Sequence, residues 1–326
     1  MSGIDPDDGP NVGPNAVPDP DPDEPGVHQS VPRRLLNGLK ENKLALFGAF
    51  VIVLLAFTAV FAPLIAPHEP EDTYGIMKSP NSESVGDYDA DGEVEEIWHP
   101  LGTDSFGHDV FTRIVYGSRI SLLVALATIV VAFSVGTTIG LVAGFYGGWI
   151  DSLLMRYIDF QWAFPEIILA VGLIAVTGGT GVWNVVIAIG IAFIDDFARL
   201  VRGEILSIRE EEYVMAARAV GMSDRRLLVR EVLPNAVAPL IVQATFMIPL
   251  AILAEASLSF LGLGVSPTTP TWGLLVSEGR NFLLRAWWIS VMPGLAIMVS
   301  VLAFNMIGDG LRDMFDVTDT EEVQQA

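Results

Sequence analysis

The segment Ile120–Ala143 reads ISLLVALATIVVAFSVGTTIGLVA, twenty-four residues without one charged side chain. A helix rises about 1.5 Å per residue, so a segment of this length can cross the roughly 30 Å of hydrocarbon in a bilayer. The segment therefore predicts a membrane-spanning helix. It also sets the fold class, because a chain that contains such a helix is expected to lie in a membrane.

The rest of the chain repeats this pattern. Of its 326 residues 51% are hydrophobic, and the mean hydropathy is +0.49, well above the average of soluble proteins. We therefore expect an all-α membrane protein with six transmembrane helices, near residues 44–66, 120–143, 153–176, 182–201, 236–262 and 286–308.

Acidic residues gather where the apolar segments stop. The formal net charge is −21, with seven Asp or Glu in residues 1–30, twelve in 67–112 and six in the last eighteen residues. Exposed carboxylates repel one another less when salt screens them, so this pattern favours a halophilic source. Residues 1–32 have too few large apolar side chains to offset the entropy of ordering. We expect them to form a disordered tail.

Basic residues indicate the orientation. If both termini are cytoplasmic, thirteen of the eighteen Lys and Arg residues lie inside, as the positive-inside rule requires. The expected location is the cytoplasmic membrane, with multiple passes. The expected parts are a tail at 1–32, a basic flank and first helix at 33–66, an extracytoplasmic segment at 67–119, a membrane domain at 120–316 and an acidic tail at 317–326.

The inside loop at about 202–235 has helix signals of its own. Residues 210–220 read as a short helix with acidic residues at its start, and Gly221 suits the left-handed backbone that ends many helices. Ser223 or Asp224 can cap a second short helix at 225–232, and Pro234 is expected to close it. Two short helices at an angle would project from the membrane. A simple connector between spans remains the alternative.

This loop resembles the EAA loop of the permeases of ATP-binding-cassette (ABC) importers, on the strength of Ala216-Ala217, Gly221 and Leu233-Pro234. The resemblance over residues 33–316 is to the C-type subunit of the dipeptide/oligopeptide/nickel permease family. It rests on His99-Pro-Leu-Gly-Thr-Asp104, Gly107-His-Asp-Val110, Tyr116-Gly-Ser-Arg119, Ala251-Ile-Leu-Ala-Glu-Ala-Ser-Leu-Ser-Phe-Leu-Gly-Leu-Gly264, Pro270-Thr-Trp-Gly273 and Phe304-Asn-Met-Ile-Gly-Asp-Gly-Leu-Arg312. Three positions depart from the pattern: Met215 replaces a glutamate, Glu231 stands where the loop often has isoleucine, and His108 replaces an arginine.

The resemblance implies a pore subunit that pairs with a homologous B-type permease as a heterodimer, contacts two ABC ATPase subunits and receives substrate from an extracytoplasmic solute-binding protein. Its other expected neighbour is membrane lipid, with no nucleic acid. Di- or oligopeptides are the expected substrates, with nickel and oligosaccharides as alternatives. The residues that the resemblance implies in ATPase coupling are Glu212, Tyr213, Ala216, Ala217, Arg218, Gly221, Met222 and Ser223.

An ATP site is not expected in this chain. A P-loop places a lysine after its glycines, and the three lysines, Lys40, Lys43 and Lys78, lack that context. The chain is therefore expected to be no enzyme and to bind no cofactor, with ATP and Mg held by partner subunits. An ion-coupled secondary transporter is the alternative. That class predicts paired, interrupted helices in an inverted repeat, and the sequence contains no convincing repeat.

Polar residues within the predicted spans are candidates for the pathway or its gate, because charge is costly in lipid. Glu255, with Ser257 and Ser259, forms one such group, and hydrogen bonding among these residues is the structural alternative. In the third span, Arg156 offers Asp159 a local partner. Glu166, in the same span, raises the same question, and we expect neither Asp159 nor Glu166 to be a substrate site.

Metal binding is not expected from the sequence. Asp87, Asp89, Asp91 and Gly92 match the start of a calcium loop, but Trp98 stands where that loop needs a bidentate glutamate. A hairpin turn is the favoured interpretation. His68 and His99 have no partner at a ligand spacing, and the chain has no cysteine. Trp272, Trp287 and Trp288 are expected to form an interfacial aromatic belt.

Overall fold

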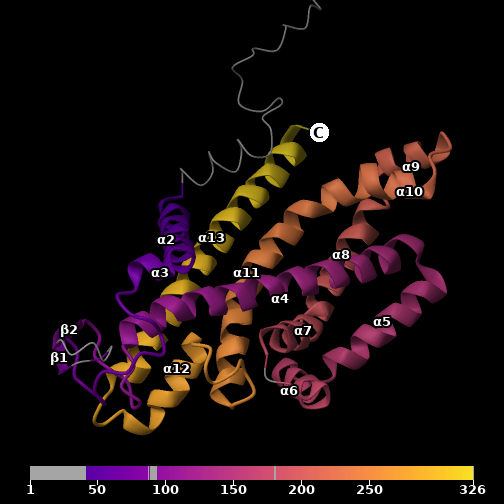
Figure 1. Ribbon diagram of the computed structural model, residues 1–326. Coiled ribbons are helices and arrows are strands. Elements are labelled where there is room, and N and C mark those ends of the chain that lie inside the picture. Colours follow the sequence, from indigo (N-terminus) through magenta and orange to yellow (C-terminus); the bar gives the residue numbers. More distant parts are fainter. Residues whose placement is uncertain (1–41, 87, 89–93, 180, 326) are drawn as a thin grey trace, which may run out of the picture.

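The computed structural model describes residues 42–86, 88, 94–179 and 181–325, and the tail expected at 1–32 lies outside them. The described chain is a helical bundle with one small β-hairpin (Figure 1). Its elements are α2 (Lys43–Val60), α3 (Ala62–Ile65), β1 (Ser82–Gly86), β2 (Glu95–His99), α4 (Val110–Tyr146), α5 (Gly148–Trp162), α6 (Glu166–Thr177), α7 (Val182–Ala192), α8 (Ile194–Ile208), α9 (Glu212–Ala219), α10 (Asp224–Leu227), η1 (Leu228–Val232), α11 (Leu233–Phe260), α12 (Trp272–Gly279), η2 (Arg280–Phe282) and α13 (Trp288–Gln325).

Helix α4 runs across the whole molecule, from the hairpin to α5 and α8 (Figure 1). Asp109 caps its start, because the side-chain Oδ1 accepts the Thr112 N–H at 2.7 Å. Gly147, with a φ of 65°, lies just after its end. The predicted span at 120–143 lies inside this helix, which begins ten residues earlier.

Helices α4 and α8 pack closely along a row of glycines. Gly136, Gly140 and Gly144 recur at four-residue intervals and therefore lie on one face of α4. A Cβ at any of them would overlap atoms of α8. This close approach holds α8 against the long helix, as small residues commonly do at interfaces between membrane helices.

Two of the predicted spans are broken. The span expected at 153–176 consists of α5 and α6, which meet at a bend of 93°. Pro165 precedes α6, and since proline has no N–H and restricts the preceding residue, the helix stops before it. The span expected at 182–201 consists of α7 and α8, joined at Phe193. A single straight helix was the wrong prediction in both places.

Pro234 does not close the loop helix as expected. Helix α10 continues through the π turn η1 into α11, so that Asp224–Phe260 forms one long helix with Pro234 near the start of α11. Proline is tolerated there because the π turn alters the hydrogen-bond ladder just before it. In the described chain, four helices are long and apolar enough to cross a membrane, and the bent α5–α6 pair makes a fifth if it is one span.

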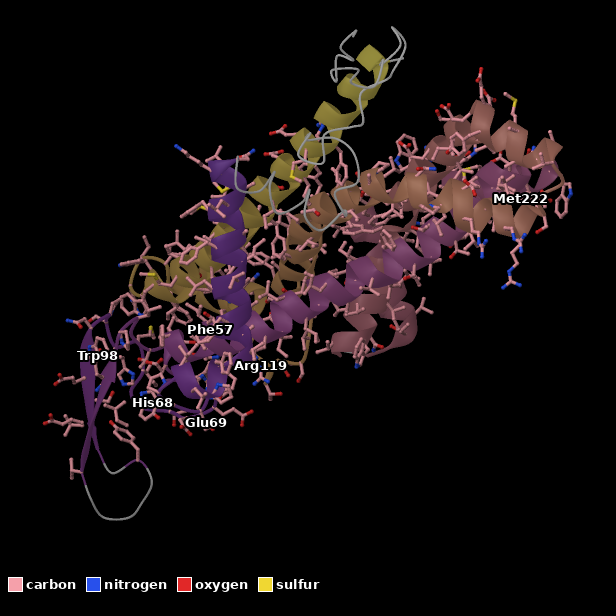
Figure 2. All side chains as sticks on the ribbon, turned by 90° about the horizontal axis from the view of Figure 1, so that it is seen from above. Phe57, His68, Glu69, Trp98, Arg119 and Met222 are labelled. Atoms are coloured by element: carbon pink, nitrogen blue, oxygen red, sulfur yellow. The ribbon has the colours of Figure 1, made fainter. Side chains whose placement is uncertain are left out.

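The hairpin and the 202–235 loop lie at opposite ends of the molecule. Figure 2 labels His68 and Trp98 beside the hairpin and Met222 at the far end, and Figure 1 separates α9 and α10 from β1 and β2 in the same way. Strands β1 and β2 pair antiparallel as a hairpin, and the turn expected between them lies largely outside the described residues. The candidate calcium ligands at positions 87, 89, 91 and 92 lie outside the described residues.

Candidate functional site

Two buried side chains anchor the 202–235 loop. Val214 of α9 and Leu227 of α10 are fully covered by the hydrophobic core, while most residues around them are exposed. Ala217 and Met222 pack partly against the same core. The short helices are therefore held by a few apolar contacts, with their other faces turned outward.

Gly221 ends α9 in the left-handed conformation that the sequence predicts, with a φ of 85°. The Met222 N–H donates to the Ala217 carbonyl at 3.1 Å, and the Gly221 N–H donates to the Arg218 carbonyl at 3.0 Å. These two bonds form the Schellman motif, which glycine favours because a Cβ is strained at positive φ. Among the described residues, apart from Gly221 and its two chain neighbours, no atom lies within 4 Å of the place where a Cβ would stand. The requirement for glycine therefore comes from the backbone alone.

The second loop helix starts through its backbone. Ser223 adopts an extended conformation and its carbonyl accepts the Leu227 N–H at 2.9 Å, but its side chain makes no capping bond. The side-chain cap expected of Ser223 is therefore absent from the structure. On α9, the Tyr213 hydroxyl accepts a hydrogen bond from the Asn235 amide at 2.8 Å. Partial burial raises the pKa of Tyr213 above its ordinary value, so the phenol stays protonated at neutral pH.

The exposed surface of the loop mixes apolar and cationic side chains. Val220 is 83% exposed, and Met215 and Val229 are also largely exposed. The cationic side chains among them are Arg218, Arg225, Arg226 and Arg230. Met and Arg are enriched at protein interfaces, and apolar residues grouped on a surface commonly mark a binding site. Glu212, Tyr213 and Ala216 belong to this same exposed face.

Glu255 lies fully buried inside this chain. Its carboxylate accepts hydrogen bonds from the hydroxyls of Ser259 at 2.7 Å and Ser121 at 3.3 Å. The Ser121 hydroxyl also accepts the Trp272 N–H at 3.1 Å. The network joins α11, α4 and the start of α12. Ser257 takes no part in it, since its hydroxyl donates to the Leu253 carbonyl at 2.7 Å.

A buried ion network fixes the other end of the molecule. The Arg113 guanidinium, 4% exposed, lies 2.5 Å from Asp104 Oδ2 and 2.6 Å from Glu278 Oε2. His108 Nδ1 lies 2.9 Å from the same oxygen of Asp104. The histidine that replaces an arginine in the family pattern thus joins an ion network. These contacts tie the start of α4 to α12.

Two tryptophans lock this end further. Trp288 donates its indole N–H to the Thr103 carbonyl at 3.1 Å, and Trp272 donates to the Ile114 carbonyl at 3.0 Å. Both rings are buried, while Trp287 is exposed. The expected interfacial belt is therefore wrong for Trp272 and Trp288, whose indole N–H groups find partners within the protein.

The histidines that look isolated in sequence are neighbours in space. The rings of His68 and His99 lie 6.0 Å apart. His99 Nδ1 lies 2.8 Å from Asp109 Oδ2, and His99 Nε2 lies 2.9 Å from the Ser84 hydroxyl. Burial lowers the pKa of His68 below its ordinary value, which keeps this imidazole neutral at neutral pH.

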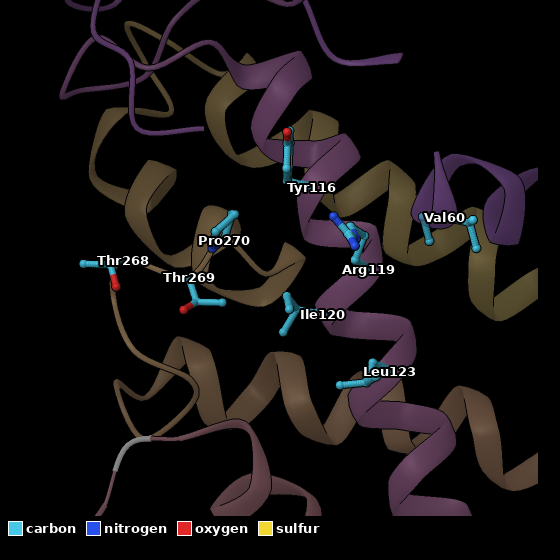
Figure 3. Close-up of a pocket in the computed structure, with 9 residues that line it drawn as sticks. Val60, Tyr116, Arg119, Ile120, Leu123, Thr268, Thr269 and Pro270 are labelled. Atoms are coloured by element: carbon cyan, nitrogen blue, oxygen red, sulfur yellow. The ribbon is translucent and has the colours of Figure 1, made fainter. Parts of the chain in front are cut away.

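A pocket of about 580 Å³ opens at the hairpin end of α4. Figure 3 shows its walls, which come from α2, α4 and the loop containing Thr268, Thr269 and Pro270. Its lining is mainly apolar, and Arg119 is the charged side chain that faces it. A charged group beside an apolar wall can orient a polar ligand or a partner chain.

Ion pairs also hold the bent α5–α6 region. Arg202 of α8 contacts Asp151 with two nitrogens, at 2.6 and 2.7 Å. Asp159 pairs with Arg199 at 3.0 Å, whereas the sequence suggested Arg156 as its partner. Arg199, which is distant in sequence, can pair with Asp159 because α5 packs beside α8.

Comparison with known proteins agrees with this geometry. Residues 136–317 match the family described as the binding-protein-dependent transport system inner membrane component, and residues 33–81 match the N-terminal transmembrane domain of oligopeptide transport permease C. The chain belongs to this transport-permease family. The C-type resemblance found in the sequence is thereby confirmed.

Relatives of this permease are similar over most of its length. The dipeptide transport system permease protein DppC of Alkalihalophilus pseudofirmus is 45% identical, over 87% of this chain and 89% of that protein. The di/tripeptide transport system permease protein DppC of Pseudomonas aeruginosa is 40% identical, over 89% and 93%. The glutathione transport system permease protein GsiD of Pectobacterium atrosepticum is 40% identical, over 85% and 88%.

A solved structure has a similar fold. The inward-facing MetNI methionine ABC transporter includes a chain that matches this permease with a TM-score of 0.53 and 18% identity, over 62% of this permease and 96% of that chain. At this identity the likeness concerns the fold alone.

Sequence reasoning missed the Arg113–Glu278 contact of this permease. A charged residue at the start of a long apolar segment was the available signal, because a cation there needs a partner. The identity of that partner could not be found from spacing, since 165 positions separate the two residues.

Proposed function

We propose that this permease is one of two membrane subunits of an ATP-driven importer of short peptides. The proposed substrate class is supported by relatives whose names specify dipeptide, di/tripeptide and glutathione transport. The proposed mechanism rests on the 202–235 loop. An exposed pair of short helices, capped by Gly221 and held by two buried anchors, has the form of an element that docks into another protein.

In the proposed mechanism the 202–235 loop sits in a cleft of a cytoplasmic ATPase. Each of two homologous permeases contacts one ATPase, and ATP with Mg binds to those partner subunits. Closure of the ATPases moves the loop, and the continuous helix from α10 through η1 to α11 carries this movement toward the membrane. The loop is joined directly to a long helix, which supports its role as a lever.

We further propose six membrane crossings with both termini in the cytoplasm. The four long helices supply four crossings, the bent α5–α6 pair supplies another, and α7 with α8 supplies the last. Residues 67–119 then lie outside, with the pocket beside Pro270 at the mouth that receives substrate from a solute-binding protein. The buried Glu255 network is proposed to brace this mouth rather than to line the pathway.

Reconstitution tests the proposed function. The permease is purified with its co-expressed partner permease and ATPases, placed in liposomes, and supplied with the solute-binding protein and a labelled dipeptide. We expect uptake that requires both ATP and the binding protein. Uptake driven by an ion gradient without ATP would contradict the proposal and favour a secondary transporter.

Cysteine labelling tests the proposed orientation. The natural chain has no cysteine, so one introduced residue gives the whole signal. Val85→Cys, on the exposed face of the hairpin, should react with an impermeant thiol reagent in intact cells, whereas Val220→Cys should react only after the cells are opened. Ser84 is unsuitable because it is buried. Equal labelling of both variants in intact cells would overturn the topology.

A further inference from the structure

Three metal-ligand side chains meet at the hairpin end although they are scattered in sequence. His68 lies between α3 and β1, His99 ends β2, and Asp109 precedes α4. One ligand atom from each residue lies within 4.8 Å of those of the other two. His99 and Asp109 are buried, and His68 is half-buried. The cluster therefore differs from the exposed carboxylates of the acidic surface, because two of its three residues are buried.

One nitrogen of this cluster is buried without a partner. His68 Nε2 is inaccessible and contacts no hydrogen-bonding group among the described residues. A neutral imidazole that donates from one nitrogen carries a lone pair on the other. A buried lone pair without a donor costs free energy, and a cation that binds to this nitrogen removes that cost.

The other two residues have the outer contacts that metal ligands use. His99 Nε2 lies 2.9 Å from the Ser84 hydroxyl, and Asp109 Oδ1 accepts the Thr112 N–H at 2.7 Å. Metal-binding histidines usually donate the N–H of their second nitrogen in this way, which fixes the ring and its tautomer. His99 Nδ1 and Asp109 Oδ2 then face each other at 2.8 Å. A metal between them would replace the shared proton.

A cavity lies beside the cluster, on its His68 side. It has a volume of about 560 Å³, and His68 forms part of its wall. Glu71, Asp72 and Glu96 line the same cavity. Their negative charges raise the local concentration of cations. A water molecule would complete the coordination of an ion held by three protein ligands.

We propose that His68 Nε2, His99 Nδ1 and Asp109 Oδ2 bind one divalent transition-metal ion, with zinc as the best match. Two imidazoles and one carboxylate suit zinc, while Mg²⁺ and Ca²⁺ prefer oxygen ligands. Ligand atoms around tetrahedral zinc lie about 3.3 Å apart. The His99–Asp109 pair must open by about 0.5 Å, and His68 must move inward. The ion clamps three segments of the extracytoplasmic region, and this role does not depend on the transported substrate.

The same contacts do not support catalysis, because a substrate cannot reach the serine. Ser84, His99 and Asp109 are connected as in a serine-hydrolase triad, with the histidine between the hydroxyl and the carboxylate. The Ser84 side chain is 0% exposed, so no substrate carbonyl can reach its oxygen. The cluster is therefore suited to holding an ion rather than to attacking a substrate.

Zinc titration of the full-length permease tests the proposal. The protein is freed of metals with a chelator, reconstituted in lipid nanodiscs, and titrated with Zn²⁺ against a competing chelator. We expect one tight site per chain. His68→Phe, which keeps a ring against Tyr74, should weaken this site by at least about 100-fold, and Ser84→Ala should weaken it by about 10-fold.

His108→Phe is the matched control, because this histidine belongs to the same segment but contacts Asp104 instead of the cluster. Its zinc affinity should equal that of the natural chain. Zn²⁺ should also raise the unfolding temperature of the natural chain and not that of His68→Phe. His68→Gln provides a second variant if His68→Phe unfolds in chelator. Equal zinc affinity in the natural chain and in the His68 variants, or displacement by Mg²⁺ at equal concentration, would overturn the proposal.

Discussion

The two ends of the permease treat their charged residues in opposite ways. At the hairpin end, Arg113 is buried between Asp104 and Glu278, and His99 is buried against Asp109. At the loop end, the arginines lie exposed on α9, α10 and η1. Buried charges need partners within the protein, whereas exposed charges are free to meet another chain. The hairpin end is thus completed by its own fold, and the loop end has a surface that a second protein can complete.

Because of this difference, the residues that stabilise the fold are expected to be distinct from those that contact the ATPase. Substitutions in the buried network should unfold the permease, while substitutions on the exposed loop should leave the fold intact and affect its contact with the ATPase. The comparison is therefore tested by paired variants, one at each end or one buried and one exposed.

The largest effect is expected at Arg113. Arg113→Met removes the cation that pairs with the buried carboxylate of Asp104 and the part-buried carboxylate of Glu278, so the free energy of unfolding should fall by about 4 kcal/mol. Chemical denaturation in detergent measures this loss. Arg225→Met, at an exposed position of the loop, should change the same quantity by less than about 0.5 kcal/mol. Similar losses in both variants would remove the contrast between the two ends.

Leu227 sharpens the comparison, because it is one of the few buried residues of the loop. Leu227→Ala leaves a cavity under α10, and the free energy of unfolding should fall by about 3 kcal/mol. Val220→Ala removes an exposed side chain on the same loop and should cost less than about 0.5 kcal/mol. If Leu227→Ala were as mild as Val220→Ala, the loop would not be anchored as the structure shows.

The neighbouring tryptophans offer a smaller effect. Trp288→Phe leaves the Thr103 carbonyl without its indole donor, and the free energy of unfolding should fall by about 1–2 kcal/mol. Trp287→Phe changes an exposed ring and should have almost no effect. Thermal unfolding of the two variants side by side distinguishes them, and equal midpoints would contradict the buried hydrogen bond.

The sequence predicts local features of this permease well. Apolar length locates the helices, and the left-handed backbone at Gly221 follows from a glycine at the end of a helical pattern. Tertiary pairings are a different matter, because they depend on which helices pack together. The Arg113–Glu278 contact and the meeting of His68 with His99 join residues whose spacing carries no signal. The bend between α5 and α6 did have a local signal in Pro165, but the apolar length of residues 153–176 favoured a single straight helix.

The central claim is that the 202–235 loop couples the permease to an ATPase, and Gly221 tests it most directly. Gly221→Val forces a β-branched residue to positive φ and should cost only about 1–2 kcal/mol, since no atom of another described residue obstructs the place of its Cβ. The matched control is Gly203→Val on α8, where the added Cβ also meets no atom of another residue in the described part of the chain but the backbone is helical.

The measurement is ATP hydrolysis by the reconstituted complex in response to the peptide-loaded binding protein. We expect Gly221→Val to insert and assemble in the membrane and to lose the stimulated hydrolysis, while Gly203→Val retains it. Full stimulation in the Gly221→Val complex would contradict the account and would leave the loop as a connector between membrane helices.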